Sequence, residues 1–200
     1  MLIIGLTGGI GSGKSEAARI LERLGAVVVN ADLAGHEAYR PGSQTWQAVV
    51  EAFGKGVVAP SGEIDRKLLG AKVFSDPAQI RRLSEIVWPE IRRILKARIE
   101  AERQAGRANA VVIEAAVLLE AGWDDLVDEV WVVDSPESLA LQRLKAKGIS
   151  PDQASARMRS QFAPEARRAR ADVVLRNDAD LLALEAAVRS AWNGRVESKA

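Results

Sequence analysis

Short runs of apolar, mostly β-branched residues recur along the chain and predict buried strands. They occupy residues 2–7, 26–30, 110–114, 129–134 and 172–175. Each run is continuous, whereas a strand with one face in water alternates apolar and polar residues. We therefore predict a buried sheet of five parallel strands.

The segments between these runs have the periodicity of amphipathic helices. Within residues 16–24, and again within 136–147, apolar side chains recur at the spacing that places them on one face of a helix. A final helix is expected from the apolar positions between 181 and 192. This alternation predicts an α/β fold, an open sheet flanked by helices and joined by right-handed crossovers.

The segment 31–107 is much longer than a crossover between two strands requires, so we interpret it as an insertion. Its apolar stripes are helical: one ends at Val87 and another begins at Ile91. Pro89 lies between them, and because a helix accepts proline in its first turn, we expect a new helix to start there. The insertion is predicted to be a helical subdomain on the substrate side of the site.

A second excursion, residues 145–170, is polar and rich in arginine. Pro151 and Pro164 are expected to divide it into short helices, and we interpret it as a mobile lid. The whole chain is then expected to form one domain, made of a core at about 1–30, 108–144 and 171–200, the helical subdomain at 31–107 and the lid at 145–170.

Composition narrows the class of partner. The chain has 28 Lys and Arg against 27 Asp and Glu, so its net charge of +1 gives no general reason to expect a nucleic-acid polymer or a membrane surface as partner. It contains no cysteine, which excludes disulfides and thiolate metal sites. No apolar run approaches the ~20 residues of a membrane span, and residues 1–6 are too short for a signal segment. We expect a soluble, cytoplasmic protein, with a monomer as the default state.

The most specific motif lies directly after the first predicted strand. Gly8, Gly13, Lys14 and Ser15 complete the spacing G-x-x-x-x-G-K-S, and a helix follows. In that context the loop amides point at phosphate oxygens, the lysine spans the β- and γ-phosphates, and the serine hydroxyl contacts Mg²⁺. The motif predicts a P-loop NTPase fold; the alternative is a glycine-rich turn beside a solvated lysine. The predicted nucleotide-binding residues are Gly9, Gly11, Ser12, Gly13, Lys14, Ser15 and Glu16.

Two acids stand at the ends of predicted strands, where parallel sheets bind their ligands. Asp32 follows the second strand and could accept a proton from an attacking hydroxyl or orient it. It could equally be the N-cap of a helix that begins at Leu33. Glu114 ends the third strand, where a carboxylate can hold Mg²⁺ or its waters; alternatively, it only caps the strand exit.

Other polar residues are further candidates. Glu120 follows the third strand and is either a site acid or a surface residue. His36 is the only histidine, which excludes histidine metal clusters and Ser-His-Asp triads, and it suits a hydrogen-bonding role better than that of a base. Phosphoryl transfer needs cations over the nucleotide, and among the arginines of the lid side we select Arg143 and Arg157, which have apolar neighbours.

Five segments follow one another in a specific order: TGGIGSGKS at 7–15, NAD at 30–32, LLE at 118–120, RMRSQ at 157–161 and ADVVLRN at 171–177. Because it contains these five segments in this order, the chain resembles the dephospho-CoA kinase family from end to end. The segments GHEAYRPG, VVEAFG, IVWP and EAAVLLEAGW are similar to the kinase domain of the animal bifunctional CoA synthase.

The resemblance implies that ATP, with Mg²⁺, donates its γ-phosphoryl group to the ribose 3′-hydroxyl of dephospho-CoA, giving CoA and ADP in the last step of CoA biosynthesis. It also implies that the helical insertion receives the acceptor while the lid excludes water. The implied roles are catalysis by Asp32, Lys14, Arg143 and Arg157, acceptor binding by Asp32, His36, Trp88 and Glu120, and metal binding by Ser15 and Glu114.

Four positions depart from the family pattern. Asn30 and Glu114 each stand where an aspartate is usual, Trp88 stands where many bacterial members have histidine, and Lys147 replaces a frequent arginine. The longer Glu114 side chain can turn a direct metal contact into one through water. Lys147 cannot reproduce the planar hydrogen bonding of an arginine.

Two other functions fit the residues when the resemblance is set aside. A different small-molecule kinase would share the phosphate-binding loop, since only the resemblance names the acceptor. A nucleotide-sensing switch would bind ATP or GTP without transfer, but the chain has no N-K-x-D segment to bind guanine, and Asp32 has no obvious purpose in a sensor.

Overall fold

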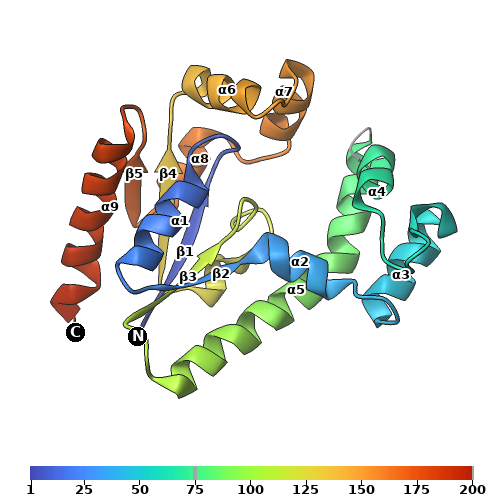
Figure 1. Cartoon of the computed structure of the whole chain (residues 1–200), viewed down its shortest axis with the longest axis horizontal. Helices are drawn as coiled ribbons and strands as arrows, with labels where there is room; N and C mark the ends of the chain where they lie inside the picture. The colour runs from blue at the N-terminus through green and yellow to red at the C-terminus, as the bar shows by residue number, and fades with distance from the viewer. Residues whose placement is uncertain (74–75, 200) are drawn as a thin grey trace. The chain divides into compact units, whose positions relative to one another are not determined.

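The computed structural model describes residues 1–73 and 76–199 and divides into two compact units. Unit 1 comprises Met1–Asn30 and Arg98–Ala200, and unit 2 comprises Ala31–Ala97. Figure 1 shows the elements of both, coloured from blue at the N-terminus to red at the C-terminus.

Unit 1 is built on a parallel sheet of five strands in the order β2-β3-β1-β4-β5. The strands are β1 (Leu2–Gly8), β2 (Val27–Asn30), β3 (Ala110–Glu114), β4 (Glu129–Asp134) and β5 (Val173–Arg176). Glu114, the last residue of β3, is in register with Leu6 of β1 on one side and Asn30 of β2 on the other. The predicted five-stranded parallel sheet is confirmed, and the strand ends differ from the sequence ranges by at most one residue.

Helices α1 and α9 cover one face of this sheet, as Figure 1 shows. Ile4 of β1 and Trp131 of β4 belong to one buried cluster with Ile20 of α1 and Val188 of α9. Burial of such side chains is the main favourable term in folding, at about 1.5–3 kcal/mol for each fully buried aliphatic side chain. The helices of unit 1 are α1 (Lys14–Arg23), α6 (Glu137–Ala146), α7 (Pro151–Arg159), α8 (Pro164–Ala169), α9 (Leu181–Arg195) and the 3₁₀ turns η2 (Trp123–Leu126) and η3 (Glu197–Lys199).

The opposite face of the sheet is covered partly by the turn that follows β3. A Cβ placed on Gly5 of β1 would lie 2.7 Å from the Leu118 side chain and 3.1 Å from that of Val127. Gly5 therefore allows the 115–127 segment to lie directly on the strand. This close packing determines the position of the residues that follow the carboxyl end of β3.

Unit 2 is helical and packs around its own core. Val49, Phe53, Leu69, Val87 and Ile91 are buried in it. The Ser43 hydroxyl caps one helix by accepting a hydrogen bond from the Trp46 amide at 3.0 Å. The elements are α2 (Ala31–Ala38), α3 (Gln44–Phe53), η1 (Lys55–Val57), α4 (Arg66–Val73) and α5 (Pro77–Ala105), the last of which continues into unit 1.

The prediction that a new helix starts at Pro89 is wrong, because Pro89 lies inside the continuous helix α5. Proline removes one amide donor, the one that would bond the carbonyl of Glu85 four residues earlier. Glu85 is exposed, so its carbonyl can be satisfied by water. The apolar positions on either side of the proline, Val87 and Ile91, are both buried in one core, and their packing outweighs the loss of one hydrogen bond.

No helix within residues 1–73 and 76–199 has both the length and the apolar character that crossing a membrane requires.

Candidate active site

The phosphate-binding loop joins β1 to α1 and owes its shape to two glycines. Gly11 has φ of 78° and Gly13 has φ of 95°, a left-handed conformation that glycine adopts without strain. The Ser12 amide donates to the Gly9 carbonyl at 3.0 Å, which closes the turn. Helix α1 begins directly after Gly13, a residue with no side chain to cap its first amides. These amides and the helix dipole form an anion-binding position.

A carboxylate from β3 connects two predicted site residues. Lys14 Nζ and Ser15 Oγ both donate to Glu114 Oε1, each at 2.7 Å. Asn30 Nδ2 donates to Glu114 Oε2 at 2.9 Å. Glu114 is 5% exposed, so the alternative that it only caps the strand exit is wrong: it is the acceptor for three side chains.

The environment of Glu114 keeps it charged. Burial opposes ionisation, but the Lys14 ammonium and the hydrogen bonds from Lys14, Ser15 and Asn30 hold the pKa of the carboxyl below its usual range. Asn30, where the resemblance predicts an aspartate, thus supplies an amide donor to a carboxylate. Sequence reasoning noted this substitution without identifying its partner, because the two residues are separated by 84 positions.

Asn177 and Arg143 contact the carbonyl side of the phosphate-binding loop. Asn177 Nδ2 donates to the Ser12 carbonyl at 2.7 Å, and Arg143 Nη1 donates to the same oxygen at 3.4 Å. Arg143 Nη2 also donates to Asn177 Oδ1 at 3.1 Å, and its Nη1 donates to Ser135 Oγ at 3.0 Å. The structure therefore brings the predicted Arg143 to the loop. Asn177 was not predicted as a site residue, although it ends the ADVVLRN segment.

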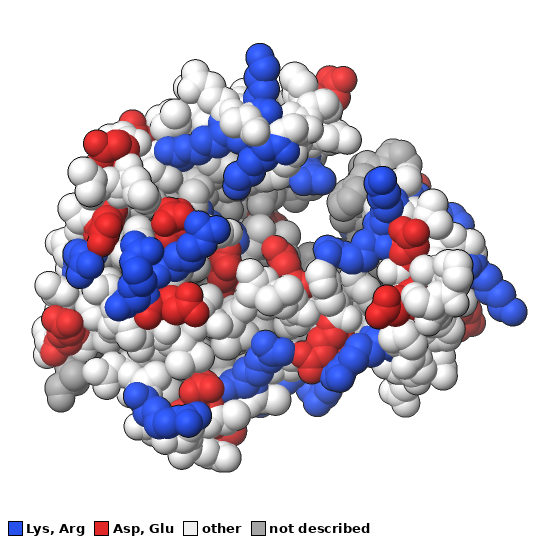
Figure 2. Space-filling view, in the orientation of Figure 1, with Lys and Arg blue, Asp and Glu red and all other residues white. Residues whose placement is uncertain are grey.

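The predicted lid contains α7 and α8, which begin at Pro151 and Pro164, as expected for residues that start short helices. Lys and Arg side chains gather over α6 and α7, at the top of Figure 2. Arg157 lies in the last turn of α7 and is exposed. Among the described residues of unit 1, no hydrogen bond or ion pair joins the Arg157 side chain to the loop, so its predicted role stays a prediction.

The segment between α7 and α8 is attached to the loop and to the turn after β3. Gln161 Oε1 accepts from the Ile10 amide at 2.9 Å, and Gln161 Nε2 donates to the Ala116 carbonyl at 3.1 Å. The next amide, that of Phe162, donates to Glu120 Oε1 at 2.7 Å. The half-buried Glu120 is therefore not a simple surface residue; its carboxylate holds the base of the lid.

Arg167 of α8 is the buried arginine of this region, with 8% of its surface exposed. Its Nη1 donates to the Phe162 carbonyl, and a Cβ placed on Gly9 would lie 2.8 Å from its Nη2. Burial lowers the pKa of the Arg167 guanidinium, and the carboxylates of Glu120 and Asp134 oppose that shift. Sequence reasoning did not single it out, because nothing local distinguishes it from the neighbouring Arg168 and Arg170.

A cavity of about 350 Å³ lies between the loop, the end of β4 and the lid helices. Gly9, Ile10 and Ser12 line it on the loop side, and Met158, Gln161 and Arg167 line it on the lid side. Its lining combines apolar side chains with two arginines, of which Arg167 is buried, and with the acids Asp134 and Glu137. This mixed lining suits a polar, charged ligand more than a purely apolar one.

The predicted acceptor residues Asp32, His36 and Trp88 lie in unit 2. Helix α2 begins at Ala31, so Asp32 is inside its first turn, and the alternative that Asp32 is the N-cap of a helix starting at Leu33 is wrong. Burial and the nearby Arg66 lower the pKa of His36, and Asp32 opposes them, so the imidazole is largely neutral at pH 7. Trp88 lies half-buried in α5.

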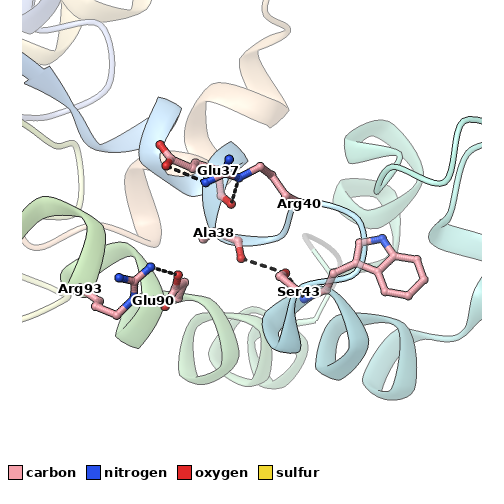
Figure 3. Close-up of polar contacts among 7 residues, drawn as sticks. Glu37, Ala38, Arg40, Ser43, Glu90 and Arg93 are labelled. Atoms are coloured by element: carbon pink, nitrogen blue, oxygen red, sulfur yellow. Dashed lines mark hydrogen bonds and ion pairs between the residues drawn. The ribbon is translucent and has the colours of Figure 1, made fainter. Parts of the chain in front are cut away.

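Two ion pairs and a turn contact surround the connection between α2 and α3 in unit 2 (Figure 3). Arg40 pairs with Glu37 at 2.8 Å and Arg93 pairs with Glu90 at 2.7 Å. Ser43 Oγ donates to the Ala38 carbonyl at 3.3 Å. The Arg40 and Ser43 contacts stabilise the turn that follows the helix carrying Asp32 and His36, whereas Arg93 and Glu90 are paired within α5.

Comparison with known proteins gives matches along the whole chain. A family model described as dephospho-CoA kinase matches residues 2–183. The dephospho-CoA kinase of Geobacter sulfurreducens is 44% identical over 196 residues, which cover 98% of this chain and 99% of that protein. Of the solved structures, a Thermus thermophilus protein has a TM-score of 0.80 at 33% identity and covers 97% of both chains. The dephospho-CoA kinase from Campylobacter jejuni has a TM-score of 0.73 at 23% identity, covering 99% of this chain and 98% of that one.

Proposed function

The chain belongs to the dephospho-CoA kinase family, and we propose that it transfers the γ-phosphoryl group of ATP to the ribose 3′-hydroxyl of dephospho-CoA, the final step of CoA biosynthesis. The observation that carries this proposal is the family match over residues 2–183 together with the contacts that Lys14 and Ser15 make to one buried acid, Glu114. A phosphate-binding loop alone would not identify the acceptor substrate.

The donor site follows from the loop in unit 1. Backbone amides of Gly11 to Ser15 bind the phosphate oxygens of ATP, and the Lys14 ammonium, released from Glu114, spans the β- and γ-phosphates. Arg143 donates to the Ser12 carbonyl of the loop, which supports its proposed contact with the nucleotide. Gly9 and Glu16 flank these residues and complete the site.

The residues present fit a magnesium ion. Mg²⁺ prefers oxygen ligands, takes few of them from the protein and keeps several waters; the Ser15 hydroxyl and the Glu114 carboxylate are 2.7 Å apart and supply two such ligands. Ser15 would bind the ion directly and Glu114 would bind it directly or through water. When bound, Mg²⁺ neutralises charge on the phosphate oxygens.

Asp32 is the residue proposed to act on the acceptor hydroxyl. It lies two positions beyond Asn30, the last residue of β2. Parallel sheets of this kind bind their ligands at the carboxyl ends of the strands. The Asp32 carboxylate accepts the proton of the 3′-hydroxyl or orients that hydroxyl as the bond to phosphorus forms. His36, one helical turn further along α2, Trp88 and Glu120 are the other residues proposed to bind or border dephospho-CoA.

The lid would limit the hydrolysis of ATP by water. Closure of lid residues over the nucleotide excludes water, and an arginine placed there, with Arg157 the one predicted from the sequence, would stabilise charge on the transferred group. The anchoring of Gln161 and Phe162 supports closure by the part of the lid that precedes them.

An assay of ADP formation coupled to detection of CoA tests the proposal. The purified full chain with Mg·ATP should produce CoA from dephospho-CoA, while AMP and shikimate, acceptors of other kinases of similar architecture, should be turned over at least about 10³-fold less efficiently. Turnover of another acceptor without formation of CoA would overturn the proposal.

A further inference from the structure

Arg167 differs in its surroundings from the other arginines of the lid. Arg168 pairs with Asp134 and Glu165, and Arg170 pairs with Asp124. Arg157 and Arg159 are exposed. Arg167 is 8% exposed, and burying a guanidinium is costly unless it is paired or has a partner to bind.

One side of the Arg167 guanidinium faces the phosphate-binding loop. Nη1 donates to the Phe162 carbonyl, while Nη2 has no hydrogen-bond partner within residues 1–73 and 76–199. Nη2 is the atom that would lie 2.8 Å from a Cβ on Gly9, and the residue lines the same cavity as Gly9 and Ile10. This donor, on a residue that is only 8% exposed, thus borders a cavity beside the phosphate-binding loop.

Glu120 is connected to this arginine through the backbone of Phe162. Its Oε1 accepts from the Phe162 amide at 2.7 Å, and the carbonyl of Phe162 accepts from Arg167. Its Oε2 is buried without a hydrogen-bond partner among the described residues, and its charge favours the protonated Arg167. One residue therefore links the acid and the guanidinium.

We propose that Arg167 is the lid arginine that binds the terminal phosphate of the nucleotide through Nη2, and that Glu120 positions it through Phe162. This inference rests on the proposed function and assigns the arginine role to a residue that the sequence did not distinguish. In the transfer step, the bond from the γ-phosphorus to the β–γ bridging oxygen breaks, a bond to the acceptor 3′-oxygen forms, and the hydroxyl proton passes to Asp32. Arg167 stabilises the charge on the equatorial oxygens during this exchange.

Variants of Arg167 and of its neighbour Arg168 test the catalytic part. Arg167→Gln should lower kcat by at least about 10²-fold while KM for dephospho-CoA changes less than about threefold, because the lost interaction is made in the transition state. Arg167→Lys keeps the charge but lacks the planar group, so its kcat should lie between that of Arg167→Gln and that of the wild type. Arg168→Gln, the matched control, should change either constant less than about threefold.

Binding measured without an acceptor gives an independent readout. The ratio of ATP affinity to ADP affinity should drop about tenfold in Arg167→Gln and stay unchanged in Arg168→Gln, because only ATP carries the phosphate that Arg167 contacts. Guanidinium ion added at low concentration should partly restore kcat to Arg167→Ala, a result that a structural role for Arg167 would not give.

The positioning part is tested at Glu120. Glu120→Gln keeps an acceptor for the Phe162 amide and should retain more activity than Glu120→Ala, and both should lower kcat more than they raise KM for ATP. A kcat of Arg167→Gln within about threefold of the wild type, or an unchanged ratio of ATP to ADP affinity, would overturn the proposal. If the wild type fails to form CoA, the proposed function fails, while the affinity ratio still tests Arg167. Should Arg167→Gln not fold, Arg167→Lys and Glu120→Gln provide the same comparisons.

Discussion

Lys14 and Glu114 form a buried ion pair, with Nζ 2.7 Å from Oε1, although 100 positions separate them in the sequence. The pair joins the lysine proposed to bind phosphate to the acid proposed to bind the metal. The same carboxylate also accepts from Ser15 and Asn30. Its charge therefore holds these side chains together in unit 1, at the position where we propose that the nucleotide binds.

Lys14→Met should destabilise the protein in a pH-dependent way. It leaves the buried Glu114 carboxylate without its counter-charge, so we expect a loss of about 3 kcal/mol in the free energy of unfolding at pH 7. In the wild type the pKa of Glu114 is lowered, so the stabilising effect of the pair is complete above the ordinary glutamate pKa of about 4.3 and is lost as the pH falls through the folded-state pKa. Urea unfolding at pH 7 and at about pH 4 should show the difference between wild type and variant shrinking on acidification.

Arg103→Gln is a suitable control for this measurement, because Arg103 forms an exposed pair with Glu100. Its effect on unfolding should be below about 0.5 kcal/mol. A Lys14→Met destabilisation of the same size at both pH values would show that the charge of Glu114 is not its cause.

Gly13→Ala should be far more damaging than Gly25→Ala. Both glycines have positive φ, 95° and 99°, so each alanine meets a similar backbone penalty of about 1–2 kcal/mol. A Cβ on Gly13 would also lie 2.1 Å from Asn177 Nδ2, whereas nothing lies within 4 Å of a Cβ on Gly25. Thermal unfolding and ATP titration should show an extra loss of at least about 2 kcal/mol and loss of ATP binding for Gly13→Ala alone.

The two glycine variants thus separate backbone strain from the displacement of Asn177. Equal destabilisation by both variants would mean that displacing Asn177 adds nothing to the loss of stability. Retention of the wild-type ATP affinity in Gly13→Ala would contradict the placement of the nucleotide on this loop.

Asp32→Asn should separate nucleotide binding from turnover. The amide keeps the size of the side chain but cannot accept the acceptor proton, so the ATP dissociation constant should change less than about threefold while kcat falls by about 10²–10⁴-fold. Calorimetric titration with an ATP analogue and the steady-state CoA assay measure the two quantities. Unchanged turnover would remove Asp32 from the mechanism.

The pKa of His36 should respond to two neighbours in opposite directions. Asp32→Asn removes the charge that raises this pKa and should lower it further, while Arg66→Gln removes a charge that lowers it and should raise it. Since His36 is the only histidine, its imidazole signals in an NMR pH titration can be followed without ambiguity. A pKa that both variants leave unchanged would show that these side chains do not lie near the imidazole in solution.

Local patterns were sufficient to predict the sheet and the loop. A short, continuous, β-branched run such as 110–114 is typical of a buried strand, and β3 spans those residues. The phosphate-binding loop depends on glycines at fixed positions of one short segment, so its spacing alone predicted Lys14 and Ser15 as site residues. Helix ends were harder to predict: Pro89 fits a first turn by local rules, yet core packing on both sides carries α5 through it.

The sequence by itself determined which segments form the five strands, where the phosphate-binding loop lies and which acids end or follow the strands, because each depends on residues that are near one another in the chain. Only the tertiary structure decided that Asn30 and Lys14 share Glu114, that Asn177 supports the loop, and that Arg167 rather than another lid arginine is buried beside Gly9. These contacts join residues far apart in the sequence. They form because the parallel sheet brings the carboxyl ends of its strands to one edge, and because polar groups buried there need hydrogen-bond partners.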